Sequence, residues 1–331
     1  MIAPRCSCAI LGPVRGNDVT RIQEASVRHF LSLVDLTRAE IEHLLDLAIE
    51  LKEEWKAGGN TRQLGGKTLG MVFQKPSLRT RVSFDMAMIH LGGQALFLSP
   101  NEIRLGERES VADVARVLSR YVDGIMARVF AHDDVVDLAR YSAVPVINGL
   151  SDTSHPCQGM ADLLTILEKH GRIAGIKITY VGDGNNVART LMFGAAKLGA
   201  HVAIATPPQY AIEAQYVALA EQFAAESGGS VAVLTDPIAA VADSDVIYTD
   251  TWTSMGQEEE AASRRQVFPP YQVNQALLRG SGAKVIVMHC LPAHRGEEIT
   301  DEVADGVHSV LFDQAENRLH AQKAILVELM A

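Results

Sequence analysis

The sequence predicts an α/β protein of two domains, each a parallel sheet flanked by helices, with the functional site in the cleft between them. The chain has 331 residues, a length typical of two domains. Short apolar runs that read as buried strands alternate with stretches of helical periodicity along most of it. Apolar residues make up 47% of the chain, so each domain can bury a core of its own.

The first domain is predicted over residues 28–155. Thr37 is a good N-cap for its first helix, and Gly92-Gly93 ends its second. The expected elements are a helix over 37–56, a strand over 68–73, a helix over 77–91, a strand over 94–98, a polar loop over 100–109, a helix over 110–121, a strand over 124–129, a helix over 133–141 and a strand over 144–147.

The second domain is predicted over residues 156–316. A long helix over 156–170 is expected to connect the two domains. Strands are expected over 177–181, 202–205, 231–234, 246–249, 284–288 and 309–312, with helices between them. A last helix is expected from about 316 to 329, and residues 317–331 are expected to pack back on the first domain.

Charge and composition narrow the possible partners. The net charge of −10 argues against nucleic acid. No apolar run reaches the roughly 18 residues of a membrane span, so we expect no membrane partner. Four cysteines are too few for a disulfide framework in a chain of this length. We therefore expect a reducing, cytoplasmic environment.

The first 27 residues differ from the rest of the chain. They show no helical period and lack the apolar core of a secretory signal. A disordered N-terminal extension is the prediction for residues 1–27, and a transit peptide is the alternative. Cys6 and Cys8 are expected to have no function there, because two residues cannot complete a metal site.

The stretch from Lys75 to Arg81 is the most informative one in the chain. Pro76 disfavours the α region at Lys75, and Ser77 is then a good N-cap for a new helix. The first turn of that helix offers free N–H groups, hydroxyls, the positive end of the dipole and guanidinium charge. This combination predicts a site for a phosphate-like anion. An ordinary capped helix with two solvated arginines is the alternative.

The helix that follows is expected to be largely buried, because apolar residues recur at Val82, Met86 and Ile89 and again at Phe84, Met88 and Leu91. Arg79 and Arg81 lie two positions apart and point about 200° apart on a helix. If Arg79 faces the anion, Arg81 must face elsewhere, and we expect a carboxylate partner for it.

The segment Gly182-Asp183-Gly184-Asn185-Asn186-Val187 follows a predicted strand and invites a dinucleotide-binding interpretation. Two observations oppose it. Val187 stands at the third glycine position, and the next strand ends in Ala205-Thr206-Pro207, with no acid to hold a ribose hydroxyl. The asparagines instead lie at the carboxyl end of a strand, where their amides can hold an α-amino acid.

Other strand ends and one helix start also carry polar side chains. Asp250 follows a strand and can bind an ammonium group, whereas Trp252 is expected to pack in the core. Cys290 ends a buried strand at the ligand-binding edge, so contact with a ligand and inert packing are equally open. His155 and Gln158 begin the connecting helix. The His and Cys residues lack zinc spacing, so we expect no metal and no cofactor.

Six blocks together resemble one family, the ornithine carbamoyltransferases, from about Phe30 to Leu329. Each block is weak alone, but all six in this order are specific. They are Ser77-Leu78-Arg79-Thr80-Arg81, His155-Pro156-Cys157-Gln158, Gly182–Asn186, Asp250-Thr251-Trp252 with Ser254-Met255-Gly256, His289-Cys290-Leu291-Pro292, and Glu316-Asn317-Arg318-Leu319-His320-Ala321-Gln322-Lys323.

The resemblance implies a role for each matching residue. The implied carbamoyl-phosphate site consists of Ser77, the backbone of Leu78, Arg79, Thr80, Arg128, His155, Gln158 and Arg318, together with Arg104 from a neighbouring subunit. The implied ornithine site consists of Asn186, Asp250, Ser254, Met255, Cys290 and Leu291. Arg128, His155, Cys290 and Arg318 are the implied catalytic residues. Leu78 stands where the family usually has Thr, and Arg104 also departs from the common residues.

The resemblance further implies the reaction and the assembly. The δ-amine of L-ornithine would attack carbamoyl phosphate to give L-citrulline and phosphate, as in arginine biosynthesis and the urea cycle. The protein would form a homotrimer or a multiple of trimers. A carbamoyltransferase for acetylornithine, succinylornithine or putrescine is the close alternative, and a non-enzymatic two-domain anion-binding protein is the alternative of another class.

Overall fold

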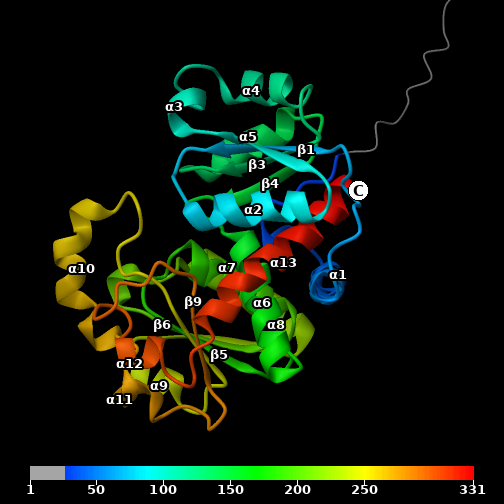
Figure 1. The fold of residues 1–331 in the computed structure, drawn as a ribbon. Helices are drawn as coiled ribbons and strands as arrows, with labels where there is room; N and C mark the ends of the chain where they lie inside the picture. Colours follow the sequence, from blue (N-terminus) through cyan, green and yellow to red (C-terminus); the bar gives the residue numbers. More distant parts are fainter. Residues whose placement is uncertain (1–26) are drawn as a thin grey trace, which may run out of the picture.

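The computed structural model describes residues 27–331. Cys6, Cys8 and the extension predicted over residues 1–27 lie, apart from Val27, outside the described residues. Two parallel sheets form the centres of two α/β domains (Figure 1). The first has the strand order β2-β1-β3-β4 and the second the order β7-β6-β5-β8-β9. The strands are β1 (Thr68–Phe73), β2 (Gln94–Leu98), β3 (Gly124–Arg128), β4 (Val146–Leu150), β5 (Lys177–Val181), β6 (His201–Ala205), β7 (Ser230–Leu234), β8 (Val246–Thr249) and β9 (Ile286–His289).

Helices cover both sheets. They are α1 (Arg38–Lys56), α2 (Leu78–His90), α3 (Pro100–Ile103), α4 (Val111–Leu118), α5 (His132–Tyr141), α6 (Pro156–His170), α7 (Asn186–Lys197), α8 (Ala214–Ser227), α9 (Pro237–Val241), α10 (Ala261–Val267), α11 (Gln275–Leu278), α12 (Asp301–Ala304) and α13 (Leu311–Met330). The parallel strands and crossover helices confirm the predicted fold class.

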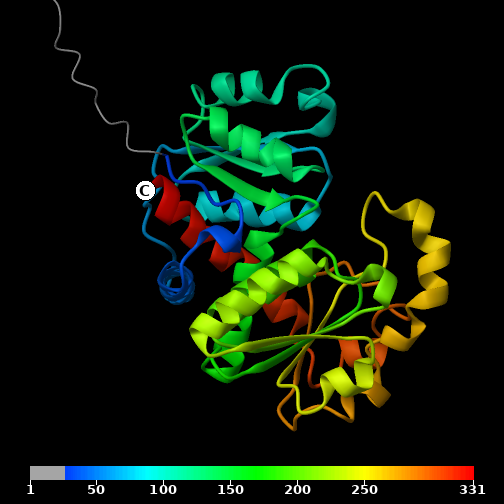
Figure 2. The same ribbon diagram turned by 180° about the vertical axis from the view of Figure 1, so that it is seen from behind.

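Two long helices join the domains. Helix α6 leads from the last strand of the first sheet to the first strand of the second. Helix α13 packs against α6, α1 and α2, and in the view from behind it runs from the second domain up to the first (Figure 2). The side chains of Gln314, Asn317 and Arg318 are therefore buried where the two domains meet.

The sequence prediction was wrong at the last strand. Residues 309–312 were expected to form a strand, but Ser309 makes only an isolated bridge to Val287, and α13 already begins at Leu311. A run of three apolar residues after Ser309 does not distinguish a short strand from the first turn of a buried helix. The helix expected over 110–121 ends at Leu118, and the loop expected over 100–109 contains the short helix α3.

Helix α2 is less buried than predicted. Phe84 and Met88 are buried, but Val82, Met86 and Ile89 on the other face are exposed. Leu78 lies on the same exposed side with 77% of its surface accessible. Leu78, Val82, Met86 and Ile89 form an exposed apolar surface on α2, called the α2 stripe below.

The expected carboxylate partner of Arg81 was also wrong. The guanidinium of Arg81 lies over the ring of Phe97, 4.1 Å from its centroid. A cation–π contact therefore takes the place of an ion pair. Among the helices of residues 27–331, none is long and apolar enough to cross a membrane.

Candidate active site

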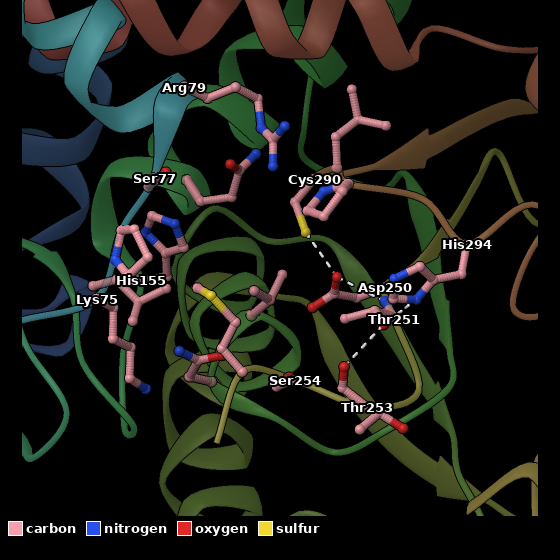
Figure 3. Close-up of a pocket in the computed structure, with 18 of the residues that line it drawn as sticks. Lys75, Ser77, Arg79, His155, Asp250, Thr251, Thr253, Ser254, Cys290 and His294 are labelled. Carbon is pink, nitrogen blue, oxygen red and sulfur yellow. Dashed lines mark hydrogen bonds between the residues drawn. The ribbon is translucent and has the colours of Figure 1, made fainter. Parts of the chain in front are cut away.

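The residues predicted from sequence meet in one cavity of about 520 Å³ between the domains. Most of them reach it from the carboxyl ends of strands in both sheets and from the N-termini of α2, α6 and α7, whereas Arg318 reaches it from within α13 (Figure 3). The predicted residues that line it are Ser77, Leu78, Arg79, Arg128, His155, Gln158, Asn186, Asp250, Ser254, Met255, Cys290, Leu291 and Arg318.

Two predicted residues do not line the cavity. Thr80 lies directly beneath it, fully buried, and its Oγ1 accepts a hydrogen bond from Nη2 of Arg318 (2.9 Å). Arg104 is exposed on the loop after α3, where it pairs with Glu107 (3.5 Å). In a single chain, Arg104 therefore takes no part in the site.

One half of the cavity is built for an anion. Ser77 caps α2 as predicted, its Oγ accepting from the Thr80 N–H at 3.3 Å. Arg128 at the end of β3 and Arg318 of α13 are both buried. Burial and the neighbouring guanidinium groups of Arg318 and Arg79 lower the pKa of Arg128 to about 9. Positive charges held together against this repulsion favour an anionic ligand.

The same half contains donors without acceptors. Within residues 27–331, no hydrogen-bond partner exists for the buried Nε atoms of Arg79, Arg128 and Arg318 or for Nδ1 of His155. A buried polar group that lacks a partner costs about 1–3 kcal/mol. A phosphate-type ligand brings several acceptor oxygens, which fit this set of donors.

His155 is held as a neutral ring at the N-terminus of α6. Burial, together with the positive charges of Arg318 and Arg128, lowers its pKa well below the ordinary value. Its backbone N–H donates to Oγ1 of Thr190 on α7 (2.9 Å), which fixes the ring at the junction of the two domains. A neutral imidazole can donate one hydrogen bond without adding charge to the arginine cluster.

The other half of the cavity is built around Asp250 at the end of β8. Its carboxylate accepts from Nδ2 of Asn185 (2.8 Å) and from the Thr251 N–H (2.8 Å). It also accepts from the Cys290 thiol, 2.9 Å away (Figure 3). Asp250 is buried, so this carboxylate is aimed at the cavity by a fixed set of donors.

Cys290 acts as a hydrogen-bond donor in this arrangement. Burial and the adjacent charge of Asp250 raise the pKa of its thiol well above the ordinary value. The thiol therefore stays protonated and is a poor nucleophile. The turn after it is fixed by His289, whose Nδ1 accepts from the Leu291 N–H (2.8 Å) while Nε2 contacts Glu298 (3.1 Å).

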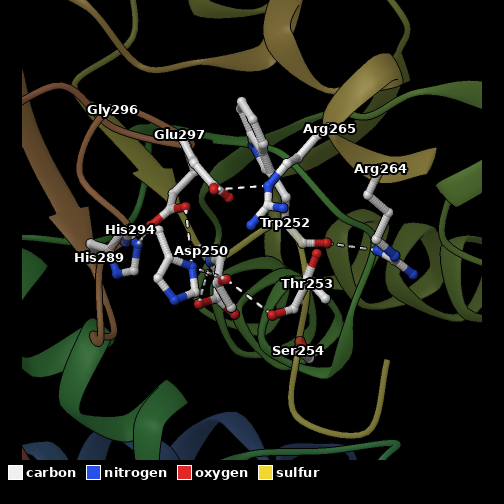
Figure 4. Close-up of polar contacts among 12 residues, drawn as sticks. Asp250, Trp252, Thr253, Ser254, Arg264, Arg265, His289, His294, Gly296 and Glu297 are labelled. Atoms are coloured by element: carbon white, nitrogen blue, oxygen red, sulfur yellow. Dashed lines mark hydrogen bonds and ion pairs between the residues drawn. The ribbon is translucent and has the colours of Figure 1, made fainter. Parts of the chain in front are cut away.

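The segment from Thr251 to Met255 forms the wall beside Asp250 (Figure 4). Arg264 of α10 fastens it: its Nη1 donates to the Trp252 carbonyl (2.8 Å) and pairs with Asp183 (3.0 Å). Trp252 is buried, as predicted. Ser254 and Met255 are thereby placed opposite the arginine cluster.

The Gly-rich turn before α7 is shaped by packing. A Cβ on Gly184 would lie 2.6 Å from the Tyr210 carbonyl, so this position requires glycine. Asn185 caps α7 through its side-chain oxygen and holds Asp250 through its nitrogen. Asn186 faces the cavity, and its Nδ2 donates to the Ser151 carbonyl (2.6 Å).

Several cavity residues carry no role in the sequence prediction. Lys75, Thr251, Thr253 and His294 line the cavity. Nζ of Lys75 lies 4.5 Å from the centroid of the Phe130 ring, and His294 contacts Thr251 (2.9 Å). Lys75 lies just before the predicted helix start, and its positive charge at that position is a signal in the sequence. His294 sits in a loop without a recognisable spacing.

Two groups of side chains within residues 27–331 have a composition that could hold a metal: Asp250, His289 and Cys290, and His294, Glu297 and Glu298. Most of their atoms already have hydrogen-bond or ion-pair partners, whereas Oε2 of Glu298 is buried without a hydrogen-bond partner among the described residues. Both ring nitrogens of His289 are hydrogen-bonded, and the Cys290 thiol is protonated. Glu297 pairs with Arg265 (3.0 Å; Figure 4). The chemistry of both groups therefore fits hydrogen bonding better than metal ligation.

Comparison with known proteins agrees with this geometry. Residues 28–168 match the family model for the aspartate/ornithine carbamoyltransferase carbamoyl-P binding domain. Residues 174–329 match the model for the Asp/Orn binding domain of the same family.

Two similar proteins come from archaea. The chain is 59% identical to an ornithine carbamoyltransferase of Thermococcus kodakarensis, covering 92% of this chain and 96% of that protein. The solved ornithine carbamoyltransferase of Pyrococcus furiosus is 58% identical with a TM-score of 0.90, covering 92% of this chain and 97% of that one.

A related structure carries another substrate in its name. The chain is 33% identical, with a TM-score of 0.83, to an N-acetyl-L-ornithine transcarbamylase, covering 92% of this chain and all of that one. The two domain matches and the high identity over nearly the whole chain lead to one conclusion: the chain belongs to the aspartate/ornithine carbamoyltransferase family.

Proposed function

We infer that the protein is an ornithine carbamoyltransferase, which transfers the carbamoyl group of carbamoyl phosphate to the δ-amine of L-ornithine and releases L-citrulline and phosphate. The observation that carries this inference is a single cavity with a cluster of guanidinium groups on one side and the Asp250 carboxylate on the other. Such a cavity suits one anionic substrate and one substrate with an ammonium group. The relatives at 58–59% identity carry this activity in their names.

Carbamoyl phosphate is proposed to bind at the start of α2. Ser77, the backbone of Leu78, Arg79 and Thr80 would hold the phosphate, which is supported by the free N–H groups at this helix end. Arg128, His155, Gln158 and Arg318 would surround the carbamoyl end. Leu78 fits a backbone role, because its side chain lies on the exposed α2 stripe.

L-Ornithine is proposed to bind on the second domain. Asp250 would hold its α-ammonium group, while Asn186, Ser254 and Met255 would bind the rest of the amino-acid end. The Cys290 thiol and the Leu291 carbonyl would lie near the δ-amine. Cys290 is supported in a non-nucleophilic role by its raised pKa.

The proposed reaction is a direct acyl transfer. The neutral δ-amine attacks the carbamoyl carbon, a C–N bond forms, and the C–O bond to phosphate breaks. Arg128, His155 and Thr80 would stabilise the charge that develops on the carbonyl oxygen. Arg79 and Arg318 would stabilise the departing phosphate, which accepts the proton of the amine. Holding both substrates in one closed site supplies further acceleration.

The test is citrulline formation from carbamoyl phosphate with each candidate amine. L-Ornithine should be carbamoylated at a kcat/KM at least 100-fold above that of acetylornithine, succinylornithine or putrescine. A preference for an acylated amine would support the closest alternative, for which the acetylornithine enzyme at 33% identity is a structural precedent. Binding of carbamoyl phosphate without turnover of any amine would support the non-enzymatic alternative.

We also propose that the protein works as a trimer with shared active sites. The α2 stripe is an exposed apolar surface of four residues that begins beside the cavity at Leu78, and such a surface is typical of a subunit interface. Arg104 is exposed, has a left-handed φ of 40° and would reach the phosphate of a neighbouring subunit. A closed ring of three chains gives every site the same neighbour.

A further inference from the structure

Asp162 lies at the centre of a buried polar network between the domains, although it does not line the cavity. It stands on α6, one turn after Gln158, and is fully buried. Its Oδ1 accepts from Nε2 of Gln158 (2.8 Å) and from Nε2 of Gln314 (2.6 Å). Gln314 belongs to α13, which packs along α6 (Figure 1).

The network determines which way the Gln158 amide points. Its nitrogen donates to Asp162, and its Oε1 accepts from Nη1 of Arg318 (3.2 Å). A rotated amide would face its oxygen to the carboxylate and its N–H groups to a guanidinium, and both contacts would be repulsive. Gln158 lines the cavity, and this orientation places its oxygen beside Arg318, which lines the cavity as well.

This oxygen has a chemical consequence for the substrate. Arg318, which contacts this oxygen, can only donate hydrogen bonds, so the Gln158 oxygen supplies an acceptor among the arginines. A carbamoyl group ends in –NH₂, which needs an acceptor, whereas an acetyl group of the same shape ends in a methyl. A site built to bond an N–H group strongly rejects an analogue that lacks it.

We propose that Asp162 is a positioning residue that fixes the Gln158 amide and thereby makes the site select carbamoyl phosphate over acetyl phosphate. The inference rests on the proposed function. Asp162 acts only through Gln158, and it is held in turn by Gln314, whose Oε1 accepts from the His289 N–H (2.8 Å). Burial raises the pKa of Asp162 to about 7, so the carboxylate is the acceptor at pH 8.

The test compares three phosphates at pH 8 in the full-length enzyme: KM for carbamoyl phosphate, and Ki for acetyl phosphate and for inorganic phosphate. Asp162→Leu removes the acceptor and should raise KM for carbamoyl phosphate about tenfold, the effect of one lost hydrogen bond. The Ki values for acetyl phosphate and inorganic phosphate should stay within twofold of the wild-type values. Asp162→Asn keeps an acceptor oxygen and should restore most of the selectivity.

Thr165→Val is the matched control. Thr165 lies one turn further along α6, equally buried, and its hydroxyl bonds Ala161 and Asn317, not Gln158. Its selectivity should equal that of the wild type. Should Asp162→Leu fail to fold, Asp162→Ala provides the same comparison.

Two results would overturn the inference. A parallel rise of all three constants in Asp162→Leu or Asp162→Ala would show a merely structural role, and three unchanged constants would show no role. In either case citrulline formation by the wild type would leave the proposed function intact. A wild type that forms no citrulline would instead refute the proposed function itself.

Discussion

At the residue scale, Arg79 and Arg81 illustrate how much a helix start reveals. The sequence correctly assigned opposite directions to the two arginines, since Arg79 lines the cavity and Arg81 stacks on Phe97. It could not identify Phe97 as the partner, because that contact joins α2 to a strand whose register depends on tertiary packing.

This pair provides a matched test of the anion site. Arg79→Ala should leave the fold intact and reduce kcat/KM for carbamoyl phosphate at least 100-fold, because it deletes a charge aimed at the phosphate. Arg81→Ala removes the same side chain two positions away and should retain most of the activity. Steady-state kinetics measures kcat/KM for both variants, and circular dichroism checks that each is folded. Near-normal kcat/KM in Arg79→Ala would remove Arg79 from the site.

Asp250 is to the proposed ornithine half of the cavity what Arg79 is to the anion half: the charged side chain that would bind the substrate. Asp250→Asn should weaken ornithine binding at least tenfold while carbamoyl phosphate binding changes less than threefold, since an amide cannot supply the charge that an ammonium group needs. Calorimetry with carbamoyl phosphate, and with ornithine plus a non-reactive phosphate, measures the two separately. Equal losses for both ligands would mean that Asp250 shapes the domain and does not bind the substrate.

The sequence identified the residues that line the cavity better than those that hold them. Lining residues follow strands or begin helices, and such positions can be read from a pattern. Asn185, Asp162 and Thr190 act through contacts between elements far apart in the chain. Asp162 in particular lies inside a helix, where a polar residue gives no signal of a role.

At the element scale, α2 departs most from its sequence pattern. Both its apolar faces were expected to be buried, yet only one packs on the core. Periodicity finds apolar faces but does not say whether a domain core or another subunit covers them. The prediction of a strand over 309–312 was wrong for a related reason, because the start of a buried helix and a buried strand have the same pattern over four residues.

The α2 stripe yields a prediction about assembly. Ile89→Glu places a charge within the proposed interface, so the protein should dissociate from trimers to monomers. Light scattering coupled to gel filtration measures the mass. Val307→Glu is the control, since Val307 is 97% exposed on a loop before α13. An unchanged mass in Ile89→Glu would place the interface elsewhere.

The segment around Asp183 yields a prediction about pH. Burial, opposed by Arg264, raises the pKa of Asp183 from 3.8 to about 6. Between these pH values the folded state binds more protons than the unfolded state, so the free energy of unfolding rises as the pH falls from 6 to 4. Asp183→Asn removes this contribution. Urea denaturation measures the free energy of unfolding of both proteins. Between pH 6 and pH 4 this free energy should rise by about 2–3 kcal/mol more in the wild type than in Asp183→Asn. A difference between the two proteins that does not change with pH would contradict the assignment.

At the scale of the whole molecule, the two-domain architecture was predictable because alternating strands and helices have few solutions. The shared active site is a different matter, because it depends on a second copy of the chain. Arg104 lies outside the cavity of its own subunit, on an exposed loop next to β2. Its role can therefore be decided only between subunits.

Mixing two inactive proteins tests that role directly. Arg79→Ala and Arg104→Ala should each lose activity as a pure trimer, because every site lacks one arginine. When the two are unfolded, mixed and refolded together, some sites take Arg79 from one chain and Arg104 from its neighbour, and these sites are complete. The mixture should then form citrulline well above the sum of the two parents. The Arg81→Ala protein, which retains both site arginines, is the control for refolding yield. Mixed trimers, confirmed by mass, that show no gain would place Arg104 outside the shared site and leave its loop as a surface connection.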